Sequence, residues 1–424
     1  MSRTSSRRRE PPPLPLFAHA AGESLRNNAV AHLNFDSRKF IEEIASFRSF
    51  GTETENFIEG GMPYFVNEFW TSGQRQSHSI HEVSYRACFK AQLPEFFISR
   101  LTKVGETVYD PFMGRGTTLV QAALQGRSAV GNDVNPLSIL LTKPRLRPIA
   151  LQDVASALRT VDWSRGQVRR DDLLAFYHPK TLADLEALRL WLAIHSGDPV
   201  ADWIGMVAIN RLSGHSPGFF SGRSMPPNQA VSIKAQIKIN EKLGVSPPER
   251  DVAQIIIKKS KSLLRDGSAP AFASFSLHTG AAWRTPVIED GSVHLVVTSP
   301  PFLDIVQYAA DNWLRCWFAG IDADAVEIAH HRTQDAWQAM VHDTLRELAR
   351  VVRPGGHVAF EVGEVRNGRV LLERLVWRAA EGLPFDRLAV IVNQQEFTKT
   401  ANCWGVSNNI SGTNTNRVVM LRRL

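Results

Sequence analysis

The sequence predicts an α/β protein with a mixed, mostly parallel sheet, interrupted by a basic and mainly helical inserted region. Three observations support this prediction. Residues 107–133 have the pattern strand, glycine turn, helix, strand, which is a βαβ unit. Strand-like runs return at residues 292–302, 355–365, 387–397 and 415–424. Residues 151–274, between these two blocks, carry amphipathic helical patterns instead of strands.

The chain has 424 residues, which is enough for two or three domains. Residues 1–60 begin with an Arg-, Ser- and Pro-rich stretch and are predicted to form a partly disordered extension. Residues 61–150 and 275–424 are predicted to form one α/β domain around the insertion at 151–274. Within the insertion, helices are expected at 232–243 and 249–265.

Composition excludes several classes of protein. Apolar residues make up 43% of the chain, but no apolar run is long enough for a membrane span. The first residues lack the apolar core of a signal peptide, so the sequence predicts a cytoplasmic protein. Cys88, Cys316 and Cys403 are far apart and form no CxxC pair, which argues against a disulfide framework and a zinc site and predicts reduced thiols that are packed or bystanders.

Positive charge is concentrated in the insertion. The net charge is +7, and the stretch from Trp203 to Arg265 alone has ten Lys or Arg against three Asp or Glu. Such a cluster favours a polyanionic partner, because it neutralises phosphates and releases counterions. An ordinary solvated helical region is the alternative. The residues of types that contact phosphates or bases are His215, Phe219, Phe220, Arg223, Asn228, Gln229, Lys258, Lys259 and Lys261.

The stretch VYDPFMGRGTT, residues 108–118, predicts a ligand-binding turn between a strand and a helix. Gly114 and Gly116 allow a tight turn and a close approach of the backbone to a ligand. The free N–H groups of the following helix can receive an anion. Asp133, at the end of the next strand, is placed to bridge two ribose hydroxyls. A tight turn with a surface aspartate is the alternative, and the stretch is neither a P-loop nor a full GxGxxG fingerprint.

DPFMGRGTT resembles the DPFxGxGTT loop of S-adenosylmethionine-dependent DNA methyltransferases that modify exocyclic amino groups. The resemblance implies a Rossmann-like class I methyltransferase fold and S-adenosyl-L-methionine as cofactor. It implies that the loop holds the methionine part, that Asp133 holds the ribose, and that the segment of Asn135 borders the adenine. Upstream, the segment around Phe89 and Lys90 resembles the family's cofactor-closing segment. The expected cofactor-binding residues are Phe89, Asp110, Phe112, Gly114, Gly116, Thr117, Asp133 and Asn135.

The sequence TSPPF, residues 298–302, predicts a stiff backbone corner at the end of a strand. Such a corner can aim the hydroxyl of Ser299 and the carbonyl of Pro300 at an amino group, while Phe302 stacks on a base that has left its helix. The expected catalytic residues are therefore Ser299, Pro300, Pro301 and Phe302. In the family that the chain resembles, SPP followed by an aromatic residue is usual for cytosine N4 enzymes, which favours cytosine and leaves adenine N6 open.

Further segments bear on the chemistry of these two motifs. Methylation at cytosine C5 needs a cysteine nucleophile, usually after proline, and no cysteine here follows a proline. Asp304, Tyr308 and Asn312 are spaced to share one helix face toward the pocket, or a solvated face. The Asn- and Thr-rich stretch at 398–416 either borders the site or forms a hairpin loop. Thr279 or Gly280 stands where the family often has an acid near the cofactor adenine.

The resemblance implies double-stranded DNA as partner, with the insertion as target-recognition region. A cognate restriction endonuclease or defence-system proteins are further expected partners, as in restriction–modification. An RNA amino-methyltransferase of the same fold is the second hypothesis, although such enzymes more often carry DPPY or NPPY. A nucleic-acid-binding module without catalysis is the third, and the intact motifs argue against it.

Overall fold

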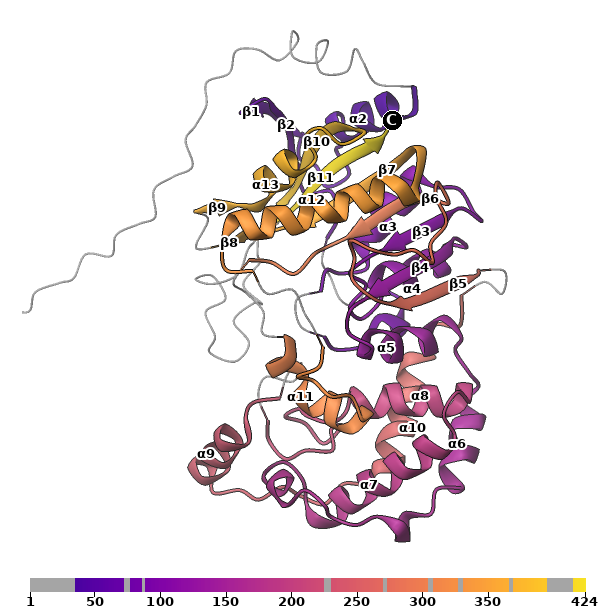
Figure 1. Ribbon diagram of the computed structural model, residues 1–424. Helices are drawn as coiled ribbons and strands as arrows, with labels where there is room; N and C mark the ends of the chain where they lie inside the picture. The colour runs from indigo at the N-terminus through magenta and orange to yellow at the C-terminus, as the bar shows by residue number, and fades with distance from the viewer. Residues whose placement is uncertain are drawn as a thin grey trace, which may run out of the picture.

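The computed structural model describes residues 35–71, 77–85, 88–224, 230–269, 273–303, 308–326, 331–365, 369–394 and 415–424. Within these residues the main sheet has nine strands in the order β1-β2-β10-β11-β7-β6-β3-β4-β5 (Figure 1). The strands are β1 (Glu55–Glu59), β2 (Met62–Asn67), β3 (Thr107–Asp110), β4 (Ser128–Asp133), β5 (Phe275–Thr279), β6 (Val293–Thr298), β7 (Val352–Val362), β10 (Phe385–Gln394) and β11 (Thr415–Arg423). A separate two-stranded sheet pairs β8 (Glu364–Val365) with β9 (Val370–Leu371).

The sheet is mixed and mostly parallel. β5, β4, β3, β6 and β7 pair in parallel along one half. β11 runs antiparallel between β7 and β10, and β2 extends the sheet in parallel to β10. The chain proceeds from β3 toward β4 and β5, and later returns on the other side of β3 as β6 and β7. This reversal leaves a crevice at the carboxyl ends of β3 and β6, where α/β sheets bind ligands. The expected Rossmann-like fold class is confirmed.

Helices cover both faces of the sheet, because its strands are apolar on both sides. Val108 and Val297 pack into a core with helices α3 and α4, whereas their neighbours Tyr109 and Val296 pack into a second core with α12 and α13. Figure 1 shows α12 across one face and α3 and α4 on the other. The helices here are α2 (Phe35–Ala45), α3 (Gln92–Leu101), α4 (Thr117–Leu124), α5 (Leu137–Leu146), α12 (Gln334–Val351) and α13 (Leu372–Ala379), with the short 3₁₀ turn η2 (Ser79–His81).

The insertion between β4 and β5 is helical, as expected. Its elements are α6 (Leu151–Arg159), η3 (Trp163–Arg165), η4 (Asp171–Ala175), α7 (Pro179–Ile194), α8 (Pro199–Ile209), α9 (Ile233–Leu243) and α10 (Val252–Leu263). The side chains of Ser232 and Asp251 accept hydrogen bonds from the first turns of α9 and α10, which fixes where these helices begin. α11 (Tyr308–Ala319), which comes after β6 in the chain, joins this region by packing against α8 and α5.

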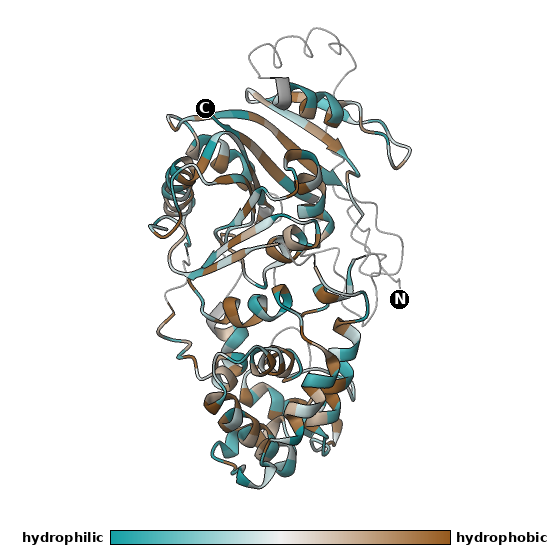
Figure 2. Ribbon diagram, turned by 90° about the vertical axis from the view of Figure 1, so that its right-hand side faces the viewer, coloured by the Kyte–Doolittle hydropathy of each residue, from teal (hydrophilic) through white to brown (hydrophobic). Residues whose placement is uncertain are grey.

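The insertion and the sheet share one core. Trp203 of α8 and Ile256 of α10 are fully buried in the same apolar cluster as Val108 of β3. Figure 2 shows hydrophobic stretches in the strands and along the helices below them. The helical region is therefore anchored rigidly to the face of the sheet that carries α4 and α5. No helix in the described part of the chain is long and apolar enough to cross a membrane.

Candidate active site

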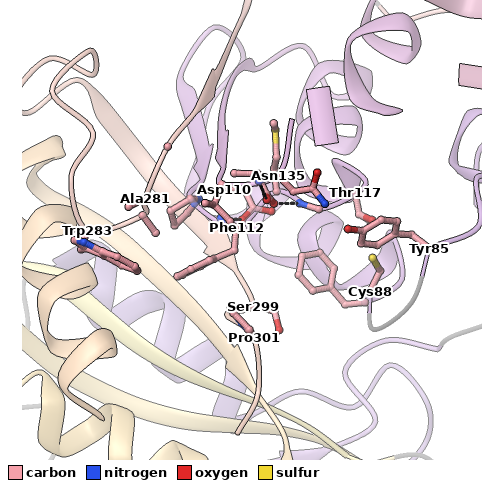
Figure 3. Close-up of a pocket in the computed structure, with 18 residues that line it drawn as sticks. Tyr85, Cys88, Asp110, Phe112, Thr117, Asn135, Ala281, Trp283, Ser299 and Pro301 are labelled. Carbon is pink, nitrogen blue, oxygen red and sulfur yellow. Dashed lines mark hydrogen bonds between the residues drawn. The ribbon is translucent and has the colours of Figure 1, made fainter. Parts of the chain in front are cut away.

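A cavity lies at the carboxyl ends of β3, β4, β5 and β6 (Figure 3). The space between its walls, with the open solvent at its mouth, measures about 830 Å³. Residues from five separate parts of the chain line it. They include Tyr85, Cys88 and Phe89; Asp110, Phe112, Gly114 and Thr117; Asp133 and Asn135; Gly280, Ala281, Ala282 and Trp283; and Ser299 and Pro301.

The glycine loop is shaped by backbone that only glycine adopts easily. Gly114 has φ 50° and Gly116 has φ 74°, both in the left-handed region. At Gly116 an added Cβ would also overlap the side chain of Thr142, whereas at Gly114 the nearest atom would be 3.7 Å away. Gly116 is the N-cap of α4, so the turn aims the start of this helix at the cavity.

Asp133 holds the loop in place from the next strand. Its Oδ2 accepts a hydrogen bond from the Gly114 N–H at 2.8 Å, and its Oδ1 accepts one from the Asn135 N–H at 2.9 Å. Burial raises the pKa of this carboxyl. A carboxylate has about four acceptor positions, so each oxygen can accept a further hydrogen bond from the cavity. Asn135 in turn accepts from the Leu137 N–H at 3.0 Å and caps the start of α5.

Asp110 connects the glycine loop to the Ser-Pro-Pro corner. The Thr298 hydroxyl of β6 donates to its Oδ1 at 2.6 Å, and the Phe112 N–H donates to the same oxygen at 3.1 Å. The side chain is 2% exposed, and this burial raises its pKa from 3.8 to about 7. A buried carboxyl that ties two strands together is mainly a structural element of the site.

Ser299 makes a contact that sequence reasoning missed. Its hydroxyl lies close enough to the carboxyl of Glu361 on β7 to lower the pKa of that group, and the Asn416 amide of β11 donates to Glu361 Oε1 at 2.8 Å. Glu361 is 5% exposed, and burial raises its pKa. One signal was present in the sequence, because Glu361 is the single acid in the otherwise apolar run HVAFEV. A buried carboxyl behind a half-buried hydroxyl that lines the cavity is an arrangement that can accept a proton.

The remaining residues of the corner are divided between the cavity and the core. Pro301 lines the cavity, and its carbonyl accepts a hydrogen bond from Trp337 Nε1 of α12 at 2.8 Å. Pro300 is buried. Phe302 packs against the apolar cluster on the α12 face and does not line the cavity. Its stacking on a base therefore stays a prediction.

One end of the cavity is formed by Tyr85, Cys88 and Phe89, and the other by the turn from Gly280 to Trp283 (Figure 3). Cys88 was expected to be a packed thiol without a role, and it lines the cavity instead, where burial raises its pKa. Burial lowers the pKa of the neighbouring Lys90. At the opposite end, Thr279 and Gly280 stand where an acid is often found in the resembling family, and neither residue carries a carboxylate. The indole of Trp283 is 40% exposed.

The basic residues of the insertion have different environments. His215, Arg223, Lys258 and Lys261 are exposed. Lys259 is half-buried and forms an ion pair with Glu82 at 3.2 Å, and its contact with phosphates stays a prediction.

Two phenylalanines of the insertion also differ from expectation. Phe220 is fully buried, and Phe219 is 8% exposed beneath the guanidinium of Arg211, so neither is free to contact a base. Asn228 and Gln229 are outside the described residues.

Two further sequence expectations have partial outcomes. Asp304 and residues 395–414 are outside the described residues, and so is the side chain of Tyr308. Asn312 is buried and accepts a hydrogen bond from Arg315 at 2.8 Å, so it faces the interior of the molecule. Cys316 is buried on α11, as its apolar context predicted. In the described part of the chain, no group of three or more His, Cys, Asp or Glu residues is arranged to hold a metal ion.

Comparison with known proteins gives matches to DNA methyltransferases over parts of the chain. A family model described as DNA methylase matches residues 55–143, which include the glycine loop and Asp133. The Type II methyltransferase M.MjaII of Methanocaldococcus jannaschii is 38% identical over 81 residues, which is 19% of this chain and 15% of that protein. The Type II methyltransferase M.MvaI of Kocuria varians is 30% identical over 127 residues, 28% of this chain and 27% of that protein.

These matches span less than a third of either relative's length. Among solved structures, TrmN from Thermus thermophilus is similar over 79% of this chain and 49% of that chain, at 13% identity and a TM-score of 0.30. At that score the likeness adds nothing to the topology described above.

Proposed function

We propose that the chain is a DNA amino-methyltransferase that transfers a methyl group from S-adenosyl-L-methionine to the exocyclic N4 of cytosine. The observation that carries the proposal is that one cavity is lined both by the glycine loop with Asp133 and by the Ser299–Pro301 corner. The residues expected to bind the cofactor and those expected to face the target base are far apart in the sequence, yet they line the same cavity. The partial matches to DNA methyltransferases support the same assignment.

The residues of the cavity fit the proposed cofactor. Asp133 has acceptor positions left for two ribose hydroxyls, while its bonds to the loop keep it in place. The Gly280–Trp283 turn supplies a flat apolar surface with an exposed indole, which suits an adenine ring. Gly114 and Thr117 border the remaining part, beside the start of α4. When bound there, S-adenosyl-L-methionine supplies an electrophilic methyl group.

Ser299 and Glu361 are placed to manage the proton of the reaction. An amino nitrogen that gains a methyl carbon must lose one proton, otherwise the product carries a positive charge. Ser299 lines the cavity and can accept that proton on its hydroxyl while its own proton passes to Glu361. Burial favours the neutral acid, and the Asn416 hydrogen bond keeps the carboxyl oriented. Proximity and orientation of the base supply the rest of the rate.

We assign cytosine rather than adenine because Ser299 stands at the position where adenine N6 enzymes of the resembling family usually have Asp or Asn. Methylation at adenine N6 is the alternative, and it would use the same fold and the same proton path. The base must leave the duplex to enter the cavity. A cognate restriction endonuclease or defence-system proteins remain proposed partners.

The insertion is the proposed DNA-contacting region, and its lysines allow a matched test. Lys258 and Lys261 are exposed, whereas Lys259 is paired with Glu82. Replacing Lys258 and Lys261 by Ala should reduce the slope of log affinity against log salt by about two, because each phosphate contact contributes about one. Lys259→Ala is the control and should leave the slope unchanged. Equal slopes for all variants would place the DNA elsewhere.

The proposed activity is tested by transfer of a labelled methyl group. The purified chain is incubated with labelled S-adenosyl-L-methionine and either unmethylated duplex DNA or RNA. We expect label in DNA only. Label in RNA alone would assign the site to the RNA hypothesis, and cofactor binding without any transfer would favour a non-catalytic module.

A further inference from the structure

Three side chains that close one end of the cavity lie on backbone without regular structure. Tyr85, Cys88 and Phe89 line the cavity, and the described residues around them, 82–85 and 88–90, belong to no helix or strand. We call these three side chains the aromatic–thiol wall. Backbone carbonyls in such a segment have no ladder partners, so other groups must satisfy them. Two arginines from distant elements do so.

Arg115 reaches this backbone from the glycine loop itself. Its Nη1 donates to the Val83 carbonyl at 2.6 Å, and its Nη2 donates to the Phe89 carbonyl at 3.3 Å. Its Nε donates to the Thr117 hydroxyl at 3.0 Å, which fixes the guanidinium against the loop. Arg115 also lies close enough to the Cys88 thiol to lower its pKa, against the larger effect of burial. The Arg115 side chain therefore joins the backbone at both ends of the segment that carries the aromatic–thiol wall to the glycine loop.

Arg315 reaches the same segment from α11. Its Nη2 donates to the Ser84 carbonyl at 3.0 Å, and its Cζ lies 5.6 Å from the centre of the Tyr85 ring. Asn312 accepts from its Nη1 at 2.8 Å and sets its direction. The side chain is 8% exposed, so this contact is part of the interior. α11 is the helix that comes after the Ser-Pro-Pro corner in the chain.

We propose that Arg115 and Arg315 are positioning residues that hold the aromatic–thiol wall in the shape required to receive the amino-acid end of the cofactor. This inference rests on the proposed function. With the ribose at Asp133 and the adenine at the Gly280–Trp283 end, the amino-acid part extends to the opposite end, where the wall stands (Figure 3). A planar guanidinium with several fixed donors can join two carbonyls at once, which a lysine ammonium does less well.

The chain offers a matched control for Arg115. Arg127, at the start of β4, donates to the carbonyls of Gln125 and Thr102 at 2.6 and 2.7 Å and to the Thr102 hydroxyl at 3.0 Å. It is half-buried, as Arg115 is. Its partners lie near the amino ends of β3 and β4, whereas the cavity lies at the carboxyl ends. Arg127→Met therefore removes the same kinds of hydrogen bond without touching the wall.

The test compares two ligands by calorimetry. S-adenosylhomocysteine contains the amino-acid part, and 5′-methylthioadenosine lacks it. We expect Arg115→Met to raise the Kd for S-adenosylhomocysteine by roughly ten- to a hundredfold. The Kd for 5′-methylthioadenosine should change by less than about threefold. Arg115→Lys should recover part of the loss. Arg127→Met should leave the affinity for both ligands unchanged. Arg315→Met, checked first for a cooperative unfolding transition, should show the same ligand selectivity as Arg115→Met.

The outcomes separate the two levels of the proposal. If Arg115→Met weakens both ligands equally, or behaves like Arg127→Met, the wall does not serve the amino-acid end and the inference is overturned. If the unaltered protein binds neither ligand, the proposed function itself fails.

Discussion

Asp133 lines the cavity and Glu361 lies buried behind Ser299, and these two carboxylates are held in different ways. Backbone N–H groups of Gly114 and Asn135 donate to Asp133, so its charge is part of the architecture of the glycine loop. The Asn416 amide donates to Glu361, the Ser299 hydroxyl lies beside it, and burial raises its pKa. Backbone amides do not give up protons, whereas a hydroxyl can relay one. The first arrangement suits binding, and the second suits chemistry.

The assignment of binding to Asp133 and of chemistry to Glu361 would be contradicted most clearly if methyl transfer did not need Glu361. Glu361→Gln keeps the size of the side chain and removes the proton acceptor. We expect the rate of methyl transfer at saturating cofactor to fall by roughly 10²–10⁴, the usual contribution of a general base. Cofactor affinity should stay within about threefold of the unaltered protein. A normal transfer rate in this variant would mean that the proton leaves by another path.

Asp133 should show the opposite pattern. Asp133→Ala removes the acceptor of the Gly114 N–H and the proposed ribose contact. We expect the Kd for S-adenosylhomocysteine to rise by roughly ten- to a hundredfold, the range for hydrogen bonds to a charged group. DNA affinity, measured by fluorescence anisotropy, should remain nearly unchanged. Unchanged cofactor affinity would refute the binding role.

Asp110 sharpens the comparison through pH. Its pKa is about 7 in the folded chain against an ordinary 3.8, because the group is buried. Between these values the folded state binds more protons than the unfolded state, so the contribution of this group to stability falls as pH rises from about 4 to 7. Asp110→Asn lacks this dependence. The variant's stability minus that of the unaltered protein should therefore increase over that range, by a few kcal/mol at most. Parallel urea-unfolding curves at every pH would contradict the assignment.

Substitution of the two loop glycines by alanine should lower the stability of the protein by different amounts. Gly114→Ala meets only the unfavourable left-handed backbone, which costs about 1–2 kcal/mol. Gly116→Ala adds an overlap with Thr142 and should lose about 1–3 kcal/mol more. Thermal unfolding measures both. A Gly116 variant no less stable than the Gly114 variant would show that Thr142 can move aside.

The strand and helix at the glycine loop could be read from the sequence, because Asp110, Gly114, Gly116 and Asp133 lie on one βαβ unit with fixed spacing. Local spacing of this kind predicts position in space. Ser299 could be placed at a strand end for the same reason. Its partner Glu361 could not, because their contact depends on which strand pairs with β6, and this is a property of the whole sheet.

Composition was a weaker guide in the insertion. Lys258, Lys259 and Lys261 lie on one helix, and sequence alone did not reveal that Lys259 faces Glu82. Phe219 and Phe220 were expected to be available for bases and are buried. Residue type predicts what a side chain can contact, but burial is decided by tertiary packing.

The most direct test of the central claim is the identity of the methylated product. The chain is incubated with S-adenosyl-L-methionine and unmethylated DNA, the DNA is digested to nucleosides, and these are analysed by mass spectrometry. N4-methylcytosine is the predicted product. N6-methyladenine would keep the proton path through Ser299 and Glu361 and overturn the choice of base. C5-methylcytosine, or no methylated nucleoside from a protein that binds the cofactor, would contradict the claim that this cavity methylates an amino group.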